Sequence, residues 1–469
     1  MACRARSPFS PAEPTGNRWV LQARTTGLMA PSSLRALRHR DYALLWGGGL
    51  VSNAGTWMQA VAVGALVVAD TEQAVWAALV AVAAFLPIGV LSPVGGALAD
   101  RLDRRRFIMA ADLFEGVLAA VLAVLAWTDQ GGPGVVTLVV LVAGCSSALR
   151  IPFQQSILPD VVPKEDLLSA TSLSSAQYNL GRVVGPALAG LVIALGSYGL
   201  AFAVNAVSFL AVVAAVALVR VPRPAPADEG GMGSRIKAGA RAALGEPACR
   251  SAIVLIGVVA LLASPFIALV PAVADRLVDG EDALGAATGA LTTAQGVGAV
   301  LGALCIVPLA DRIGLRRLLV ADLVLCPLAL VVYGYAPHIV SAVLALTVVG
   351  ALYIGLLSGL STVVQLRAPE AYRGRVLSLY MVALGVVYPI GALLQGAVAD
   401  VVGLPATTAG FALGLVAVVL VLAWLRPDFL AALGEGGEVG APAPTAPGAV
   451  AEAPEPVEPL PSATGATGT

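Results

Sequence analysis

Long apolar segments separated by short polar turns fill the chain between residues 42 and 425. A hydrocarbon core of roughly 30 Å is crossed by about 20 helical residues, and each of these segments is long enough to do so. Because lipid offers no hydrogen-bond partner to an open backbone, the segments are predicted to be helices. The pattern therefore predicts an all-α polytopic membrane protein with twelve transmembrane helices. The twelve segments are 42–69, 74–99, 107–128, 134–157, 168–195, 199–219, 251–274, 284–310, 317–336, 338–366, 376–400 and 406–425.

The composition agrees with a membrane protein and excludes several other classes. Of the 469 residues, 58% are hydrophobic and only 12% are charged, against about a quarter in an ordinary soluble domain. A large soluble enzyme, a disulfide scaffold and a disordered protein are thereby excluded. The five cysteines and two histidines form no cluster with metal-ligand spacing. We therefore expect no enzyme activity, no metal and no cofactor, and the net charge of −1 provides no field for nucleic acid.

The basic residues indicate how the helices are oriented. When both termini and the even-numbered turns are placed on one side, that side carries 25 of the 28 lysines and arginines, and the other side carries only Arg276. The positive-inside rule then predicts that both termini are cytoplasmic. Only Lys164 and Lys237 are lysines, a bias that favours a GC-rich bacterial source. We therefore predict a multi-pass protein of the bacterial inner membrane.

Three segments stand outside the apolar pattern and set the domain organisation. Residues 1–41 form a polar N-terminal segment, and the stretch from Met29 would itself make a natural start. Residues 220–250 are rich in Pro, Gly and charge and form a central linker between helical bundles at 42–219 and 251–425. Residues 426–469 form a cytoplasmic tail that is predicted to be disordered from about residue 434.

Polar landmarks recur at a constant spacing, which indicates that the two bundles are repeats. Both repeats begin on the same side, so a pseudo-two-fold axis along the membrane normal relates them. Such proteins carry substrate near mid-membrane between the halves, by rocking one half against the other. The landmarks are Asp100-Arg101 with Asp311-Arg312 at an offset of 211, and Asp112 with Asp322 and Gln155 with Gln365 at an offset of 210.

The loop between the second and third segments carries a charged motif that is repeated in the second half. It reads GALADRLDRRR over 96–106, and the second copy reads VPLADRIGLRR over 307–317. With the twelve segments, it resembles motif A of the major facilitator superfamily, which implies contacts that hold the cytoplasmic side shut. The alternative is that the arginines only anchor the loops in the cytoplasm. The residues involved are Gly96, Asp100, Arg101, Arg104, Arg105, Asp311, Arg312, Gly314, Arg316 and Arg317.

A glycine-rich motif lies in the fifth segment. Gly181, Gly185, Pro186 and Gly190 resemble motif C of the drug:proton antiporter branch of that superfamily. Small residues four apart let helices approach closely, and proline favours a kink. The resemblance implies packing of helices 5 and 8 across the two halves, with Gly285/Gly289 and Gly298/Gly302 as the partner surface, and it implies export. Generic glycine-rich packing is the alternative.

Four further segments narrow the resemblance. Residues 158–163, 202–209, 365–370 and 373–378 are similar to the enterobactin-exporter and macrolide-efflux group. The similarity implies a monomeric proton antiporter that exports a small, fairly apolar molecule such as a drug, antibiotic, secondary metabolite or siderophore. Its partners would be that substrate, protons and the lipid bilayer. The alternative is an uptake symporter of the same fold, which motif C disfavours.

Ionisable groups inside apolar segments are costly and are therefore candidate functional residues. Asp112 and Glu115 share a helix face, and Asp112 and Asp322 are expected to pair with motif arginines. Glu115 is deeper and is a plausible proton carrier. Arg150 and Arg182 would balance these acids or contact an anionic substrate group. Five polar residues either line the cavity or form interhelical hydrogen bonds: Asn53, Gln59, Gln154, Gln177 and Asn179.

Overall fold

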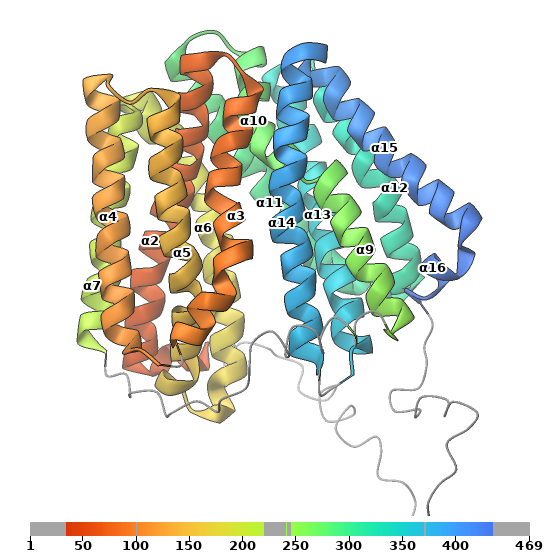
Figure 1. Cartoon of the computed structure of the whole chain (residues 1–469), viewed down its shortest axis with the longest axis horizontal. Helices are drawn as coiled ribbons and strands as arrows, with labels where there is room; N and C mark the ends of the chain where they lie inside the picture. The colour runs from red at the N-terminus through yellow and green to blue at the C-terminus, as the bar shows by residue number, and fades with distance from the viewer. Residues whose placement is uncertain (1–33, 100, 220–240, 242–244, 370–371, 435–469) are drawn as a thin grey trace, which may run out of the picture. The chain divides into compact units, whose positions relative to one another are not determined.

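The computed structural model describes residues 34–99, 101–219, 241, 245–369 and 372–434. Within those ranges the chain is helical, and short turns join the helices (Figure 1). The first half contains six long helices preceded by the short helix η1 (Arg35–Arg38), with η2 (Lys164–Asp166) before the fifth. The six are α2 (Arg40–Thr71), α3 (Ala74–Ala99), α4 (Arg104–Thr128), α5 (Pro133–Val161), α6 (Leu167–Leu195) and α7 (Tyr198–Leu218).

The second half repeats this helical arrangement, with one helix broken and a short helix added at the end. α9 begins at Pro247, inside the predicted linker; the rest of the linker lies outside the described residues except Arg241, Gly245 and Glu246. The helices are α9 (Pro247–Leu262), α10 (Phe266–Leu277), α11 (Glu281–Ile313), α12 (Leu315–Gly334), α13 (Ile339–Arg367), α14 (Arg373–Val402), α15 (Leu404–Leu425) and α16 (Pro427–Ala431).

Eleven helical segments of the described chain are long and apolar enough to cross a membrane, with α9 and α10 counted together as Pro247–Leu277. α12 is not among the eleven, although it occupies the predicted ninth segment and packs against α13 and α15. It carries Arg316, Arg317 and Asp322 near its start. The prediction of an all-helical polytopic membrane protein is confirmed, with eleven spans or twelve if α12 is included.

The turns that follow α3 and α11 show why the two copies of the charged motif differ. Gly314 ends α11 with φ 86°, a left-handed conformation that favours glycine. In the first copy the equivalent residue is Asp103, which has φ −64° and whose side chain accepts a hydrogen bond from the backbone N–H of Arg106. Asp103 is thus the N-cap of α4. The turn between the two helices therefore relies on backbone freedom in the second half and on side-chain capping in the first.

The span predicted as one helix over 251–274 is broken between Leu262 and Phe266, which corrects the sequence prediction. A break leaves the last carbonyls of α9 without partners inside the helix. The side-chain amide of Gln395 on α14 donates to the carbonyls of Leu261 at 3.1 Å and Leu262 at 3.0 Å. The hydroxyl of Tyr353 on α13 donates to Ser264 inside the break at 2.9 Å. Side chains on neighbouring helices therefore form hydrogen bonds with the broken segment, which lipid could not do.

Replacing Gln395 with Leu should destabilise this break, because two buried carbonyls lose their donor. An unsatisfied buried carbonyl costs about 1–3 kcal/mol, so we expect a lower midpoint of thermal unfolding for the purified protein in detergent. The matched control is Gln154→Leu, which makes the same change at an exposed position on α5. Equal midpoints for the two variants would contradict this role for Gln395.

Contacts between the two halves extend from the middle of α3 to its first turn. The carboxylate of Asp400 on α14 accepts hydrogen bonds from the backbone N–H groups of Ala74 at 2.7 Å and Val75 at 3.1 Å. An acid at a helix N-terminus also complements the helix dipole. Further along α3, the rings of Phe85 and Tyr388 meet edge to face at 5.6 Å. α3 and α14 run side by side through these contacts (Figure 1).

Candidate transport site

Two acids on α4 and one arginine on α5 form an ion-pair cluster inside the first bundle. Asp112 and Glu115 lie on one face of α4, and Ser147 and Arg150 lie on the facing side of α5, each pair three residues apart. Arg150 donates to both carboxylate oxygens of Glu115, from Nε at 3.1 Å and Nη2 at 3.2 Å. Ser147 donates to Glu115 Oε1 at 3.0 Å. This bidentate geometry is the strong form of an arginine–carboxylate pair.

Asp112 shares the same guanidinium but is held less well. Arg150 Nη1 lies 3.3 Å from Asp112 Oδ1, and neither carboxylate oxygen of Asp112 has a hydrogen-bond partner within the described residues. The side chains of Asp112, Glu115 and Arg150 are 0%, 5% and 12% exposed. The cluster is therefore buried and contains two acids for one cation.

The motif arginines make other contacts, so the expected pairing of Asp112 with them is wrong. Arg104 donates to the Asp160 carboxylate at 2.6 Å and to the Ser156 carbonyl at 3.1 Å, which joins α4 to the end of α5. Arg105 donates to the last carbonyls of α7, at Val216 and Ala217. These bonds stay within the first half. Arg101 is exposed, Gly96 is half-buried, and Asp100 lies outside the described residues.

The second copy of the motif lies at the same end of the second bundle. Arg316 donates from Nε to the Leu430 carbonyl at 3.2 Å and so fixes α16 against α12. Asp311, Arg312 and Arg317 are exposed. Asp322 is buried, and the described residues place no cation within ion-pair distance of it, in contrast to the expected pairing with motif arginines. Its Oδ2 fills the space that a side chain at Gly355 on α13 would occupy.

The glycines of the second motif are divided between two neighbours. Gly181 and Gly185 face α2, where a Cβ at either would meet the backbone or side chains of residues 53–58. Gly190 faces α11, and a Cβ on Gly289 would lie 2.7 Å from the Pro186 carbonyl oxygen and 2.8 Å from the Gly190 nitrogen. The motif thus packs α6 against both halves. Gly285 also faces α6, whereas Gly298 and Gly302 face α13, not α6 as expected.

The polar residues predicted to line a cavity mostly bond to neighbouring helices. Asn53 donates to the carbonyls of Gln177 and Tyr178 at 3.2 and 3.3 Å, and the Gln177 amide donates to the Trp46 carbonyl at 2.7 Å. These bonds tie α2 to α6. Gln59 accepts from Asn205 on α7 at 2.8 Å. Asn179 bonds within its own helix, and Gln154 is exposed.

Arg182 belongs to a group of aromatic residues that lies apart from the acids. Its guanidinium carbon is 5.6 Å from the centre of the Trp57 ring, within the range of a cation–π contact. Trp57 in turn meets the ring of Tyr178 edge to face at 5.9 Å. The backbone of Arg182 packs against α11 of the second half, where a Cβ on Gly296 would lie 3.2 Å from the Arg182 carbonyl oxygen. Trp57 and Arg182 are half-buried, and Tyr178 is exposed.

Sequence reasoning missed several members of these networks. Ser147, Trp57 and Asn205 were not predicted, although Asn205 is an amide inside an apolar segment, the same signal that identified Asn53. A third network lies at the start of the chain, where Asp166 accepts from His39 at 2.9 Å and pairs with Arg35 at 3.1 Å. This network attaches η1 to the start of α6, and nothing in the spacing of these residues indicates it.

Comparison with known proteins agrees with this architecture. The sequence pattern of the transmembrane secretion effector family matches residues 31–433. The chain is 27% identical to the multidrug efflux pump Tap of Mycolicibacterium fortuitum over 388 residues, covering 79% of this chain and 93% of Tap. It is 29% identical to the enterobactin exporter EntS of Escherichia coli over 337 residues, covering 70% of this chain and 78% of EntS. Its fold matches the inward-facing crystal structure of a bacterial homolog of the human lysosomal transporter Spinster, with a TM-score of 0.63 and 14% identity over 86% and 97% of the two chains. The chain therefore belongs to the transmembrane secretion effector family of the major facilitator superfamily and is a multi-pass secondary transporter related to efflux pumps.

Proposed function

We propose that this protein is a proton antiporter that exports a small, fairly apolar molecule from the bacterial cytoplasm, with both termini on the cytoplasmic side. The observation that carries the proposal is the buried cluster in which Asp112 and Glu115 share Arg150. The relatives support export, since their names describe a multidrug efflux pump and an enterobactin exporter.

The cluster has the charge balance that a proton site needs. With every group ionised it carries two negative charges and one positive charge, and an uncompensated charge is costly inside a membrane protein. One bound proton makes the cluster neutral. We place that proton on Asp112, because Glu115 accepts three hydrogen bonds that favour its ionised form and Asp112 accepts none. This assignment replaces Glu115 by Asp112 as the proton carrier.

The aromatic group around Arg182 is the candidate substrate surface. Trp57 is half-buried and Tyr178 is exposed, their rings meet edge to face, and Arg182 places one cation over the Trp57 ring. Flat aromatic surfaces bind bulky apolar molecules without demanding one pattern of hydrogen bonds. The polar side chains on α2 and α6 that bond to backbone carbonyls would instead hold this surface in place.

Transport by inverted membrane vesicles tests both the direction and the coupling. Vesicles that contain the protein and have an acidified lumen should accumulate at least one compound from a panel of antibiotics, dyes and enterobactin, and collapse of the pH gradient should abolish the accumulation. Accumulation in right-side-out vesicles instead would favour the uptake symporter. The proposal would be overturned if neither vesicle orientation showed gradient-dependent transport of any compound.

Asp112→Asn in the same vesicles tests the proton site. The amide imitates a protonated carboxyl that cannot release its proton, so we expect gradient-driven accumulation to fall to background while substrate exchange without a gradient continues. Asp129→Asn is the matched control, because it makes the same change on the same helix at an exposed C-cap with φ 55°, which asparagine tolerates. Full gradient-driven transport by Asp112→Asn would show that the coupling proton lies elsewhere.

A further inference from the structure

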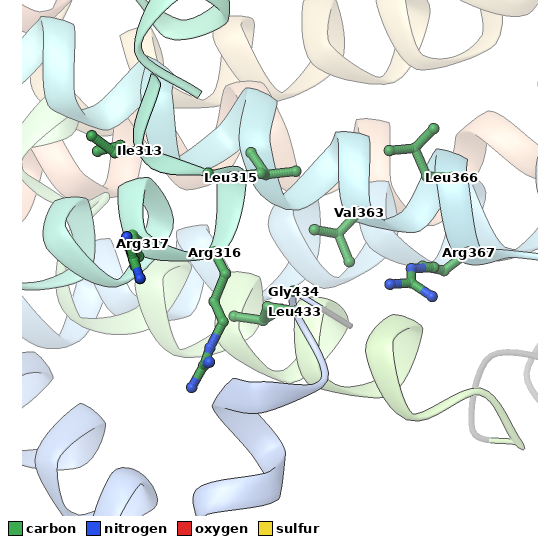
Figure 2. Close-up of a pocket in the computed structure, with 10 residues that line it drawn as sticks. Ile313, Leu315, Arg316, Arg317, Val363, Leu366, Arg367, Leu433 and Gly434 are labelled. Carbon is green, nitrogen blue, oxygen red and sulfur yellow. The ribbon is translucent and has the colours of Figure 1, made fainter. Parts of the chain in front are cut away.

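Three arginines surround a pocket at the motif-bearing end of the second bundle, and we propose that it binds the headgroup of an anionic phospholipid. The pocket has a volume of about 310 Å³ and lies where the α11–α12 turn, the end of α13 and the segment after α16 meet (Figure 2). Arg316, Arg317 and Arg367 supply its charge, and Leu315, Val363 and Leu433 are among its apolar walls. The proposal is independent of the proton site and of the transported molecule.

The charge on the pocket has no balancing acid among the residues that line it. Within the described part of the chain, none of the three guanidiniums has a carboxylate within ion-pair distance. The one bond described for them, from Arg316 Nε to the Leu430 carbonyl, fixes the side chain without neutralising it. Figure 2 shows the three arginines spread along the pocket, with Leu433 between Arg316 and Arg367. A pocket lined by three unneutralised cations favours an anionic ligand, and a phosphate group can accept charge-assisted hydrogen bonds from more than one of them.

An adjoining groove distinguishes a lipid from a free phosphate ion. A second pocket of about 520 Å³ shares Arg316 and Arg317 and continues along α12 past Val320, Ala321 and Val324. Residues 317, 320, 321 and 324 recur with helical spacing, so they form one stripe roughly 10 Å long at 1.5 Å per residue. Cations at one end of an apolar stripe match a ligand with a phosphate and a hydrocarbon chain, whereas inorganic phosphate would leave the stripe unused.

The location of the pocket also fits a lipid. α12 contributes exposed apolar side chains, including Leu325, Leu328 and Val332, further along the helix. Its arginines stand at the helix end, where basic pockets between membrane helices meet lipid headgroups. A monoanionic phospholipid such as phosphatidylglycerol would place its phosphate among the arginines and one acyl chain along Val320 and Val324.

Native mass spectrometry of the full-length protein, purified in detergent, tests the proposal. Samples are titrated with phosphatidylglycerol, with phosphatidylethanolamine of the same acyl chains, or with inorganic phosphate. We expect phosphatidylglycerol to be retained at least tenfold more tightly than phosphatidylethanolamine. Arg317→Gln and Arg367→Gln should each weaken phosphatidylglycerol binding about fivefold, the factor for about 1 kcal/mol per basic residue near anionic lipid. Arg250→Gln, at an exposed position outside the pocket, should leave binding unchanged.

A further variant tests the groove without touching the cations. Ala321→Phe narrows the apolar stripe, so it should weaken binding of phosphatidylglycerol while the three arginines remain. Each variant is first shown to elute from size exclusion as the unaltered protein does. Equal retention of phosphatidylglycerol by the unaltered protein and by the Arg317→Gln/Arg367→Gln double variant would overturn the proposal. So would competition by inorganic phosphate that displaces the lipid at equal concentration, because the site would then bind phosphate alone.

Discussion

Replacing Arg150 with Met is expected to abolish proton-driven transport and to lower the free energy of unfolding by about 3–5 kcal/mol, the cost of breaking a buried ion pair by removing one partner. Both carboxyls would remain buried, at 0% and 5% exposure, without their shared cation. Methionine matches the arginine stem in length and apolar character, so lost packing contributes little to the effect. Without Arg150, Asp112 and Glu115 would each bind a proton. No cation would then favour the ionised form of either acid, so neither would release its proton during transport.

Stability and transport measured together separate these effects. Unfolding of the purified protein by heat in detergent gives the stability change, and inverted vesicles give the transport rate. A triple variant, Asp112→Asn, Glu115→Gln and Arg150→Met, removes every charge of the cluster and should recover most of the lost stability while remaining unable to couple to protons. Arg106→Met, at a side chain that is 83% exposed, is the control. A triple variant no more stable than the single variant would contradict the assignment of Arg150 as the shared cation.

The helical spans followed directly from the sequence because burial in lipid demands long apolar helices. The described helices begin and end within a few residues of the predicted segments. The break after Leu262 has a local signal in Pro265, which lacks a backbone N–H and is the N-cap of α10. Pro87 and Pro186 lie inside unbroken helices, so a proline in the sequence does not by itself predict a break. The partner of the freed carbonyls, Gln395, lies on α14 and is far from the break in sequence, so the sequence does not indicate it.

The buried charges show a similar limit. Sequence reasoning identified Asp112, Glu115 and Arg150, since each is an ionisable residue inside an apolar segment. It could not assign the partners, because the register of α4 against α5 decides which charges meet. Proximity along the chain favoured the motif arginines, but Arg104 and Arg105 reach helix ends at Asp160, Val216 and Ala217 instead.

The two halves repeat in fold but not in charge. The offset of 210 that relates Asp112 to Asp322 places Leu325 and Leu360 at the positions of Glu115 and Arg150. Asp322 is accordingly buried without a described cation, beside Gly355. Among the described residues, a cluster of two acids and one cation is therefore found in the first half, and glycines of both halves, Gly190 and Gly289, form the close contact between α6 and α11. This division supports a single proton site in the proposed function.

Gly289→Val is expected to remove transport almost completely, because it separates the halves where the backbones of α6 and α11 are in close contact. A Cβ at this position would lie 2.7 Å from the Pro186 carbonyl oxygen, 2.8 Å from the Gly190 nitrogen and 2.9 Å from the Gly190 Cα. All three are backbone atoms, so no side chain can rotate away. Overpacking of this kind costs about 1–3 kcal/mol, and the strain falls on a contact between halves that must slide or rock during transport.

A graded series tests this contact against simple loss of folding. Gly289→Ala introduces the same Cβ without branching and should reduce the transport rate less than valine does, while both variants still elute as folded protein. Gly410→Val on α15 is the matched control, since no atom lies within 4 Å of its added Cβ, and its transport rate should equal that of the unaltered chain. Equal transport by Gly289→Val and Gly410→Val would mean that α6 and α11 need not approach closely. Reduced transport by the Gly289 variants alone would identify the α6–α11 contact as part of the motion. The atoms that exclude a side chain at Gly289 all belong to the backbone of α6, in the opposite half.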